Sequence, residues 1–188
     1  MRRVILALPF ALLPTLAIAA DHDHTHHDSL GAHEHGAAQL DAALEGSTLE
    51  IELRSPAMNL VGFEHAPVSE TDRRKISAAR TELEQPNGLF GLPAAAGCTL
   101  AKTELESPLF EGDAHEHEHE HDEDHEGQHS EIHARYRFEC ATPQALQALN
   151  LQGLFSTFPG TQKIQAQLIG PNGQRGAQLD AEQPRTAF

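Results

Sequence analysis

The chain has 188 residues and a formal net charge of −15, because 28 aspartates and glutamates outnumber 13 lysines and arginines. This charge excludes nucleic acid and anionic membrane surfaces as partners, since no basic patch is available to neutralise phosphate groups. It suits a protein that binds cations. The length allows one domain with a core of its own, and we expect no second domain.

Residues 1–19 have the pattern of a secretory signal peptide. Two arginines precede an apolar run that ends in small residues, so we expect cleavage after Ala19 or, nearly as well, after Ala20. The run is too short and too interrupted by prolines for a transmembrane helix, and no second long apolar run follows. We therefore expect a periplasmic protein without membrane insertion.

The chain has two cysteines, Cys98 and Cys140. Thiols tend to oxidise in an exported protein, so we expect a disulfide bond between them. That bond would leave no thiolate to bind a metal.

Histidine is placed very unevenly along the chain. Of the 14 histidines, six lie within residues 22–35, seven lie within residues 115–133, and His65 stands apart. The stretches 20–32 and 111–130 contain almost no apolar side chains, so they cannot bury enough surface to offset chain entropy. We expect a disordered N-terminal tail and a long disordered internal loop.

The remaining residues show the periodicity of strands and helices. Alternation over residues 38–44 and 49–53, around a turn at residues 45–47, predicts a hairpin with one buried face. Ser69 and Asp72 resemble a capping box at the start of a helix that ends at residues 86–88. The apolar stripe of that helix consists of Ile76, Ala79 and Leu83.

Residues 98–106 and 132–140 predict two strands joined by the histidine-rich loop. If they pair antiparallel with Cys98 opposite Cys140, Leu100 faces Phe138 and the four side chains point to the same side. Thr142-Pro143 predicts the start of a helix. Its buried positions would be Leu146, Leu149, Leu154 and Phe155.

A last hairpin is predicted over residues 164–168 and 177–179, around a turn at residues 171–173. The order ββα, ββα, ββ predicts an α+β fold, with an antiparallel sheet that carries helices on one face. We expect one metal-binding domain over residues 33–182 and a C-terminal tail over residues 183–188.

The loop alternates imidazole with carboxylate, two ligand types that Zn²⁺ accepts, and a flexible chain can fold several of them around one ion. The alternative is a solvated acidic linker. A flexible site imposes little geometry, so Cu²⁺ or Ni²⁺ should bind in vitro at least as well. The loop candidates are His115, His117, His119, His121, His125 and His129. The candidates for metal capture by the tail are His22, His24, His26 and His27.

A second group of histidines lies at the edges of predicted strands. His33 and His35 project to one side of an extended chain, and a third ligand would come from Glu64, His65 or His133. For His65 the sequence leaves two roles open: a metal ligand, or a histidine that is hydrogen-bonded to the backbone. We predict an ordered site of His33, His35, His65 and His133, with Glu64 as a substitute ligand or as a hydrogen-bond partner.

The identity of the metal follows from the ligands that are missing. Cu⁺ prefers thiolate and thioether, yet the mature chain offers only Met58 if the disulfide forms. Ca²⁺ would use oxygen cages. Zn²⁺ is therefore the expected metal. Since no predicted helix carries an HExxH motif, and the sequence has no nucleophile elbow or phosphate loop, we expect no enzyme activity.

Several stretches together resemble a known family. They are His33-Glu34-His35-Gly36, residues 55–67 (SPAMNLVGFEHAP), Cys98, residues 133–140 (HARYRFEC) and residues 154–159 (LFSTFP). From about residue 33 to residue 179 the chain resembles the periplasmic zinc-uptake accessory proteins of the ZrgA type, found in Gram-negative bacteria. The resemblance implies zinc acquisition under scarcity, with metal held in the periplasm and passed to an import system such as a zinc ABC importer or its receptor.

Three other functions compete with zinc uptake. The receptor of a zinc ABC importer needs two lobes, and this chain is too short for them. A periplasmic protein that buffers or detoxifies copper or nickel would be induced by excess metal instead of by a chelator. A periplasmic metallohydrolase would need three protein ligands and an open fourth position on the metal.

Overall fold

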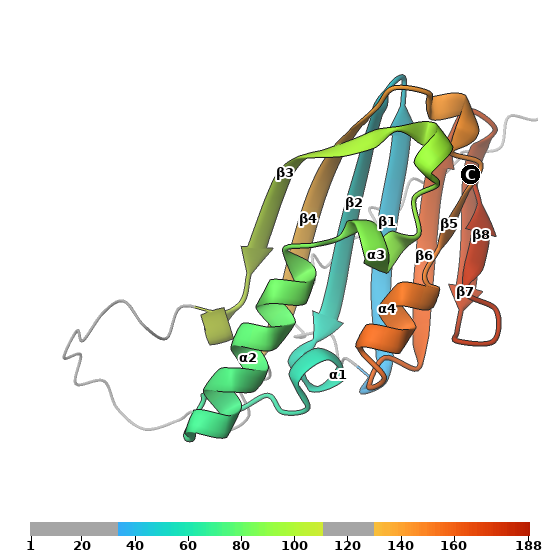
Figure 1. The fold of residues 1–188 in the computed structure, drawn as a ribbon. Coiled ribbons are helices and arrows are strands. Elements are labelled where there is room, and N and C mark those ends of the chain that lie inside the picture. Colours follow the sequence, from blue (N-terminus) through green and yellow to red (C-terminus); the bar gives the residue numbers. More distant parts are fainter. Residues whose placement is uncertain (1–33, 111–129) are drawn as a thin grey trace, which may run out of the picture. The chain divides into compact units, whose positions relative to one another are not determined.

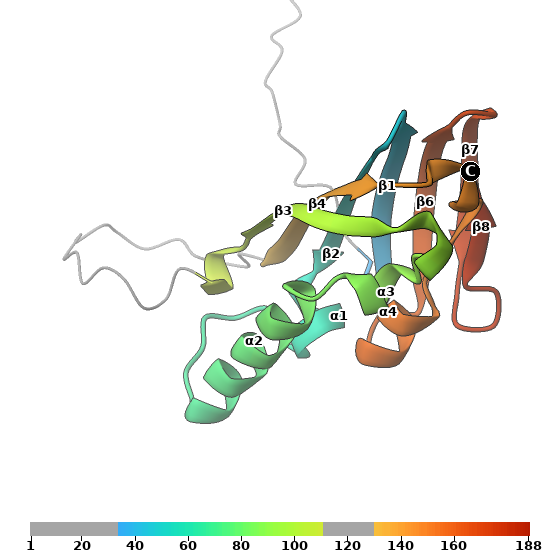
Figure 2. The ribbon, with the colours of Figure 1, turned by 45° about the horizontal axis from the view of Figure 1, so that its top comes forward.

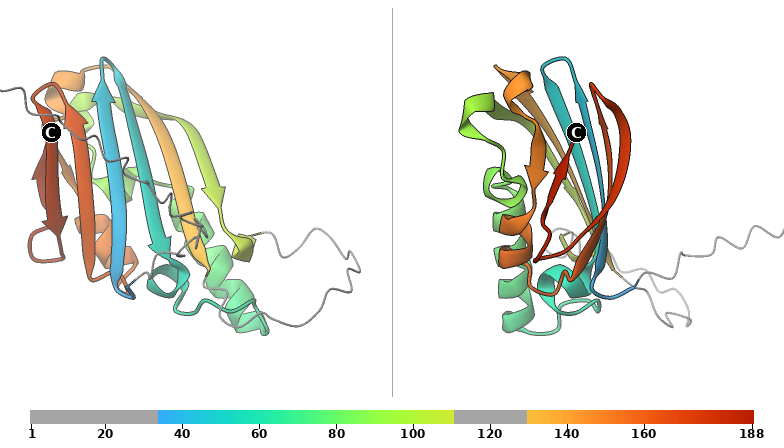
Figure 3. Two further views of the ribbon diagram at one scale, coloured as in Figure 1. Left: turned by 180° about the vertical axis from the view of Figure 1, so that it is seen from behind. Right: turned by 90° about the vertical axis from the view of Figure 1, so that its right-hand side faces the viewer.

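The computed structural model describes residues 34–110 and 130–188 (Figure 1). A six-stranded sheet in the order β3-β4-β2-β1-β6-β7 is covered by helices on one face, here called the inner face (Figure 3). The apolar core lies between this face and the helices, and the other face of the sheet is here called the outer face. The predicted α+β class is confirmed.

The first hairpin consists of β1 (Ala37–Glu45) and β2 (Thr48–Pro56), as predicted. Gly46 lies in the turn with φ 59°, a conformation that favours glycine. Alternate side chains of both strands, among them Leu40 and Leu53, are buried on the inner face. The alternation of apolar residues therefore determines which face each side chain occupies.

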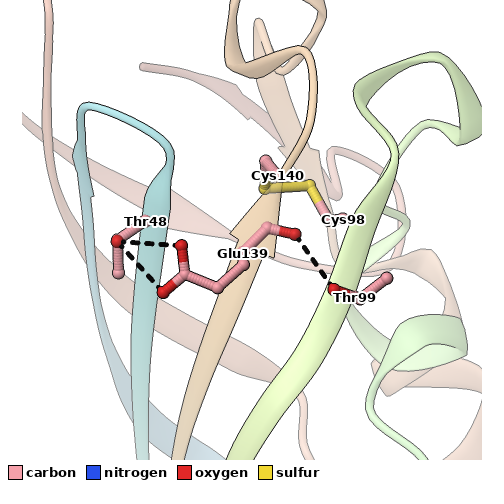
Figure 4. The surroundings of a disulfide bond; sticks show 5 residues. All are labelled: Thr48, Cys98, Thr99, Glu139 and Cys140. Carbon is pink, nitrogen blue, oxygen red and sulfur yellow. Dashed lines mark hydrogen bonds between the residues drawn. A yellow bond between two sulfur atoms is a disulfide. The ribbon is translucent and has the colours of Figure 1, made fainter.

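The strands β3 (Cys98–Glu106) and β4 (Glu131–Cys140) pair antiparallel. Cys98 lies opposite Cys140 and forms the predicted disulfide with it (Figure 4). Leu100 lies opposite Phe138, also as predicted, but it is 37% exposed because β3 is the edge strand. The register shifts between Leu100 and Lys102.

The last hairpin, β6 (Lys163–Gly170) and β7 (Gly173–Leu179), is confirmed as well. The sheet is not antiparallel throughout, because β6 pairs with β1 in the parallel direction. The connection from β4 crosses the helical side of the sheet, so the chain enters β6 from the same end as β1 (Figure 1). At that end, the backbone N–H groups of Gln162 and Lys163 both donate to the carbonyl of Gly36.

The predicted helix after Thr142 is wrong. The segment contains the 3₁₀ turn η3 (Pro143–Ala145), the strand β5 (Ala148–Asn150) and the helix α4 (Gln152–Thr157). β5 pairs with β8 (Arg185–Ala187), and this pairing overrides the local helical pattern. All four leucine and phenylalanine positions predicted to be buried there are buried.

We expected a tail over residues 183–188, but the structure places β8 within it and buries Phe188. Two backbone hydrogen bonds hold the C-terminal residues in this position. Leu151 N donates to Pro184 O, and Phe188 N donates to Gln147 O. The C-terminal residues therefore extend the layer that covers the inner face.

The helix α2 (Glu70–Leu83) begins with the predicted capping box between Ser69 and Asp72. Its predicted stripe of Ile76, Ala79 and Leu83 is buried. The shorter elements on this side of the sheet are α1 (Ala57–Val61), α3 (Asn87–Phe90), η1 (Ala94–Ala96) and η2 (Pro108–Phe110) (Figure 2). In the two ranges that the structure describes, no helix is long and apolar enough to cross a membrane.

Candidate metal-binding site

A buried asparagine joins the start of β1 to the end of β2. Asn59, in α1, is 3% exposed and uses its whole side-chain amide. Its Oδ1 accepts a hydrogen bond from Gly36 N at 2.6 Å, and its Nδ2 donates to Ala37 O at 2.8 Å and to Ser55 Oγ at 3.1 Å. The residues just before β1 are therefore held against α1.

This arrangement brings together two of the predicted site residues, His35 and Glu64. His35 Nε2 lies 3.1 Å from Glu64 Oε1, and the side chain of Glu64 is only 10% exposed while that of His35 is 51% exposed. Glu64 reaches this position because α1 ends at Gly62, whose φ of 84° turns the chain back towards the sheet. The pair is thus an accessible imidazole beside a nearly buried carboxylate.

The start of β4 lies at the same place. Ser130 Oγ donates to the backbone carbonyl of Glu64 at 2.9 Å, and Ala57 N donates to Ser130 O at 2.8 Å. Residue 34 follows the histidine-rich stretch 20–32 closely, and residue 130 ends the stretch 111–130. The described residues His35 and Ser130 therefore both lie beside Glu64.

The geometry of the His35–Glu64 pair suits a zinc ion. In a tetrahedral site with zinc–nitrogen and zinc–oxygen bonds of about 2.0–2.2 Å, neighbouring ligand atoms lie about 3.4 Å apart. The observed separation of 3.1 Å between Nε2 and Oε1 is close to that value. Both atoms can bind one zinc ion once the imidazole ring turns, because the ion lies off the line along which Nε2 now points at Oε1.

His65 makes the backbone contact that was one of its two expected roles. Its Nδ1 donates to Ala66 O at 2.8 Å, and its ring stacks on Phe63 with centroids 4.8 Å apart. The carbonyl can only accept, so the proton of the neutral ring is on Nδ1 and the lone pair is on Nε2. Metal-binding histidines commonly hold their second ring nitrogen in this way, so the contact does not exclude the role of ligand.

His133 lies on the outer face of β4, in a second imidazole–carboxylate pair. Its Nε2 lies 3.1 Å from Glu131 Oε2. Its cross-strand neighbours are Arg54 on β2 and Glu106 on β3.

The four-histidine site is not assembled by the described residues alone. Within residues 34–110 and 130–188, no three histidine, cysteine, aspartate or glutamate side chains are placed to hold one metal ion. His33 lies outside these ranges, so the full ligand set stays a prediction. Also outside them are His22, His24, His26, His27, His115, His117, His119, His121, His125 and His129.

Three residues near the site were not predicted from the sequence. Asn59 and Ser130 make the backbone contacts described above, and Lys163 Nζ lies 2.8 Å from Glu34 Oε2. Asn59 could have been found, because it is a polar residue at a buried position between Ala57 and Val61. Lys163 could not have been found from the sequence, since its contact with Glu34 depends on the parallel pairing of β6 with β1.

A hollow of about 530 Å³ on the outer face is a separate feature. It lies over the middle of the sheet, where ion pairs such as Arg54–Asp41 at 2.6 Å and Arg135–Glu106 at 2.9 Å connect neighbouring strands. Neither His35 nor Glu64 lines it. The hollow therefore does not define the metal site.

These observations define a class of protein: a disulfide-bonded α+β domain with imidazole–carboxylate donor pairs, the donors that divalent transition metals use. A family model described as "ZrgA family zinc uptake protein" matches residues 32–188, and the chain belongs to this family. The match covers every described residue and confirms the resemblance seen in the sequence. It also supports a role in zinc uptake. No curated protein matches the chain.

Proposed function

We propose that the protein captures zinc in the periplasm and passes it to an import system, with His35 and Glu64 as the nucleus of its ordered site. The contact of 3.1 Å between His35 Nε2 and Glu64 Oε1 carries the proposal. A nearly buried carboxylate fixes the imidazole, and the exposed half of the ring leaves the metal accessible for transfer. The role is one of binding without catalysis.

His33, which is adjacent in sequence to the pair, supplies the next ligand in this proposal. His65 and His133 would have to move to join it, because the described residues do not place three such side chains around one point. The histidines of the two histidine-rich stretches, residues 20–32 and 111–130, collect further zinc ions at lower affinity. The affinity is lower because a flexible chain loses entropy when it wraps around a metal. Cu²⁺ and Ni²⁺ should bind those stretches in vitro as well.

Zinc calorimetry on three proteins tests this proposal. Deletion of residues 111–129, which keeps Ser130 and its contacts to Glu64 and Ala57, should remove several weak equivalents and leave one tighter site, because the deleted stretch carries ligands but almost no apolar surface. In the deleted protein, Glu64→Gln should weaken the tighter site at least tenfold, or about 1.4 kcal/mol. The amide cannot supply the anionic oxygen.

Glu45→Gln is the matched control, since Glu45 lies at the opposite end of β1 and the substitution removes the same charge. It should leave the tighter site unchanged. If Glu64→Gln and Glu45→Gln bind zinc equally well, Glu64 is not a ligand and the proposed nucleus is wrong.

A further inference from the structure

We infer that Asn59 is the positioning residue of the metal site, which holds His35 in the orientation that meets Glu64. The inference rests on the proposed function, because it concerns how the same pair is prepared for zinc. Asn59 touches neither side chain of the pair in the contacts described above. It acts on the backbone that follows His35.

Two hydrogen bonds to adjacent residues carry the inference. Asn59 Oδ1 accepts from Gly36 N at 2.6 Å, and Nδ2 donates to Ala37 O at 2.8 Å. The Gly36 N–H belongs to the peptide before Gly36 and the Ala37 carbonyl belongs to the peptide after Ala37, so one planar amide holds the backbone on both sides of Gly36. Because the Gly36 N–H belongs to the peptide that follows His35, this hydrogen bond restricts the backbone from which the His35 side chain projects.

The opposite side of Gly36 is held as well. Its carbonyl accepts from Gln162 N at 2.7 Å and from Lys163 N at 2.9 Å. A Cβ at position 36 would lie 3.1 Å from Gln162 Cδ, and the φ of +84° is unfavourable for any residue with a side chain. Gly36 is therefore clamped between Asn59 and the start of β6.

The side chain that binds Gly36 and the carboxylate that meets His35 come from the same short stretch of chain. Asn59 lies within α1, and Glu64 lies just beyond the Gly62 residue that ends this helix. The start of α1 is tied to β4, since Ala57 N donates to Ser130 O. This stretch therefore presents a backbone clamp and a carboxylate together, so zinc does not have to order His35 when it binds.

Thermodynamic linkage makes the inference testable in both directions. If the Asn59–Gly36 hydrogen bond favours zinc binding, zinc must favour that hydrogen bond by the same factor. A purely structural asparagine would stabilise the fold equally with and without zinc. The Gly36 amide proton reports this difference, because its exchange with solvent requires the hydrogen bond to open.

The first measurement is the affinity of the complete chain for its tightest zinc equivalent, by competition with a chelator. Asn59→Ala should weaken it about tenfold, within the usual range of coupling between sites. Ser55→Ala is the matched control: it removes the third hydrogen bond of Asn59, also buried, but leaves those to Gly36 and Ala37. It should destabilise the fold and leave zinc affinity within about twofold.

The second measurement needs no substitution, so it tests the role of Asn59 even if Asn59→Ala does not fold. Zinc added to the unmodified chain should slow exchange of the Gly36 amide about tenfold more than it slows the core amides that exchange only on global unfolding, because zinc binding stabilises the whole fold as well. A Gly36 amide slowed no more than those core amides, or equal zinc affinities for Asn59→Ala and the unmodified chain, overturns the inference. If Glu64→Gln weakens zinc binding in the same assay, the proposed function survives that outcome. If Glu64→Gln has no effect, the proposed function itself fails.

Discussion

At the scale of single residues, the site depends on a glycine that leaves room for the backbone of α1. A Cβ at Gly160 would lie 2.5 Å from the carbonyl oxygen of Asn59. Real Cβ atoms essentially never approach backbone that closely, so a larger residue must displace either α1 or the start of β6. Gly160 therefore allows the two sides of the Gly36 clamp to approach each other.

Gly160→Ala should lower the free energy of unfolding by about 1–3 kcal/mol, the usual effect of overpacking. It should also weaken zinc binding, because the shift moves Asn59 and with it His35. Urea denaturation and a zinc titration measure the two effects. Gly88→Ala is the control, since a Cβ there meets no heavy atom within 4 Å. Equal unfolding free energies for the two variants would contradict the steric argument.

At the scale of elements, α2 owes its start to a carboxylate. Asp72 Oδ2 accepts from the backbone N–H groups of Ser69 at 3.0 Å and Val68 at 3.2 Å, and Asp72 N donates to Ser69 Oγ at 3.1 Å. The side chain of Ser69 is the main cause that lowers the pKa of Asp72 below 3.8. Desolvation opposes this effect, while the backbone N–H groups of Val68 and Ser69 and the charge of His65 add to it.

The lowered pKa of Asp72 predicts how the stability of α2 depends on pH. The contribution of the carboxylate is present above pH 3.8 and is lost as the pH falls through the lower pKa of the folded state. At neutral pH, Asp72→Asn should therefore have a lower Tm than the unmodified protein. The difference should shrink on acidification below pH 3.8. A constant difference in Tm, measured by circular dichroism across this range, would contradict the role of the charge.

At the scale of the whole molecule, the disulfide secures an edge strand. β3 pairs with β4 on one side only, and Cys98 and Cys140 are 42 residues apart in the sequence. Glu139 lies beside the bond: its carboxylate accepts from Thr48 Oγ1 and its carbonyl accepts from Thr99 Oγ1, each at 3.3 Å (Figure 4). The bond and these contacts connect the β3 edge to the centre of the sheet.

Reduction of the Cys98–Cys140 bond should lower the free energy of unfolding by about 3–4 kcal/mol, because the unfolded chain loses a closed loop of this length. Thermal unfolding with and without reductant measures the effect, and a Cys98→Ser, Cys140→Ser double variant checks it without reductant. The proposed zinc site lies at the other end of β4, so its affinity should not change below the unfolding temperature. An unchanged Tm would show that the bond does not constrain the unfolded chain.

The sequence by itself determined the features that depend on neighbouring residues. Alternating apolar side chains predicted the hairpins β1–β2 and β6–β7, and the Ser69–Asp72 spacing predicted the start of α2. The disulfide, although it joins distant residues, followed from the export signal expected at residues 1–19, and the register then considered for the two strands agreed with it. These inferences succeeded because periodicity and capping act within a few residues.

Only the tertiary structure decided which distant residues meet. β5 formed in place of a predicted helix because β8, more than thirty residues later, supplies its hydrogen bonds. His35 meets Glu64, whereas His133 pairs with Glu131 on the outer face. Asn59 holds Gly36 from one side, and the other side of Gly36 is held only because β6 lies beside β1. Strand order depends on burial across the whole sheet, which no local pattern encodes.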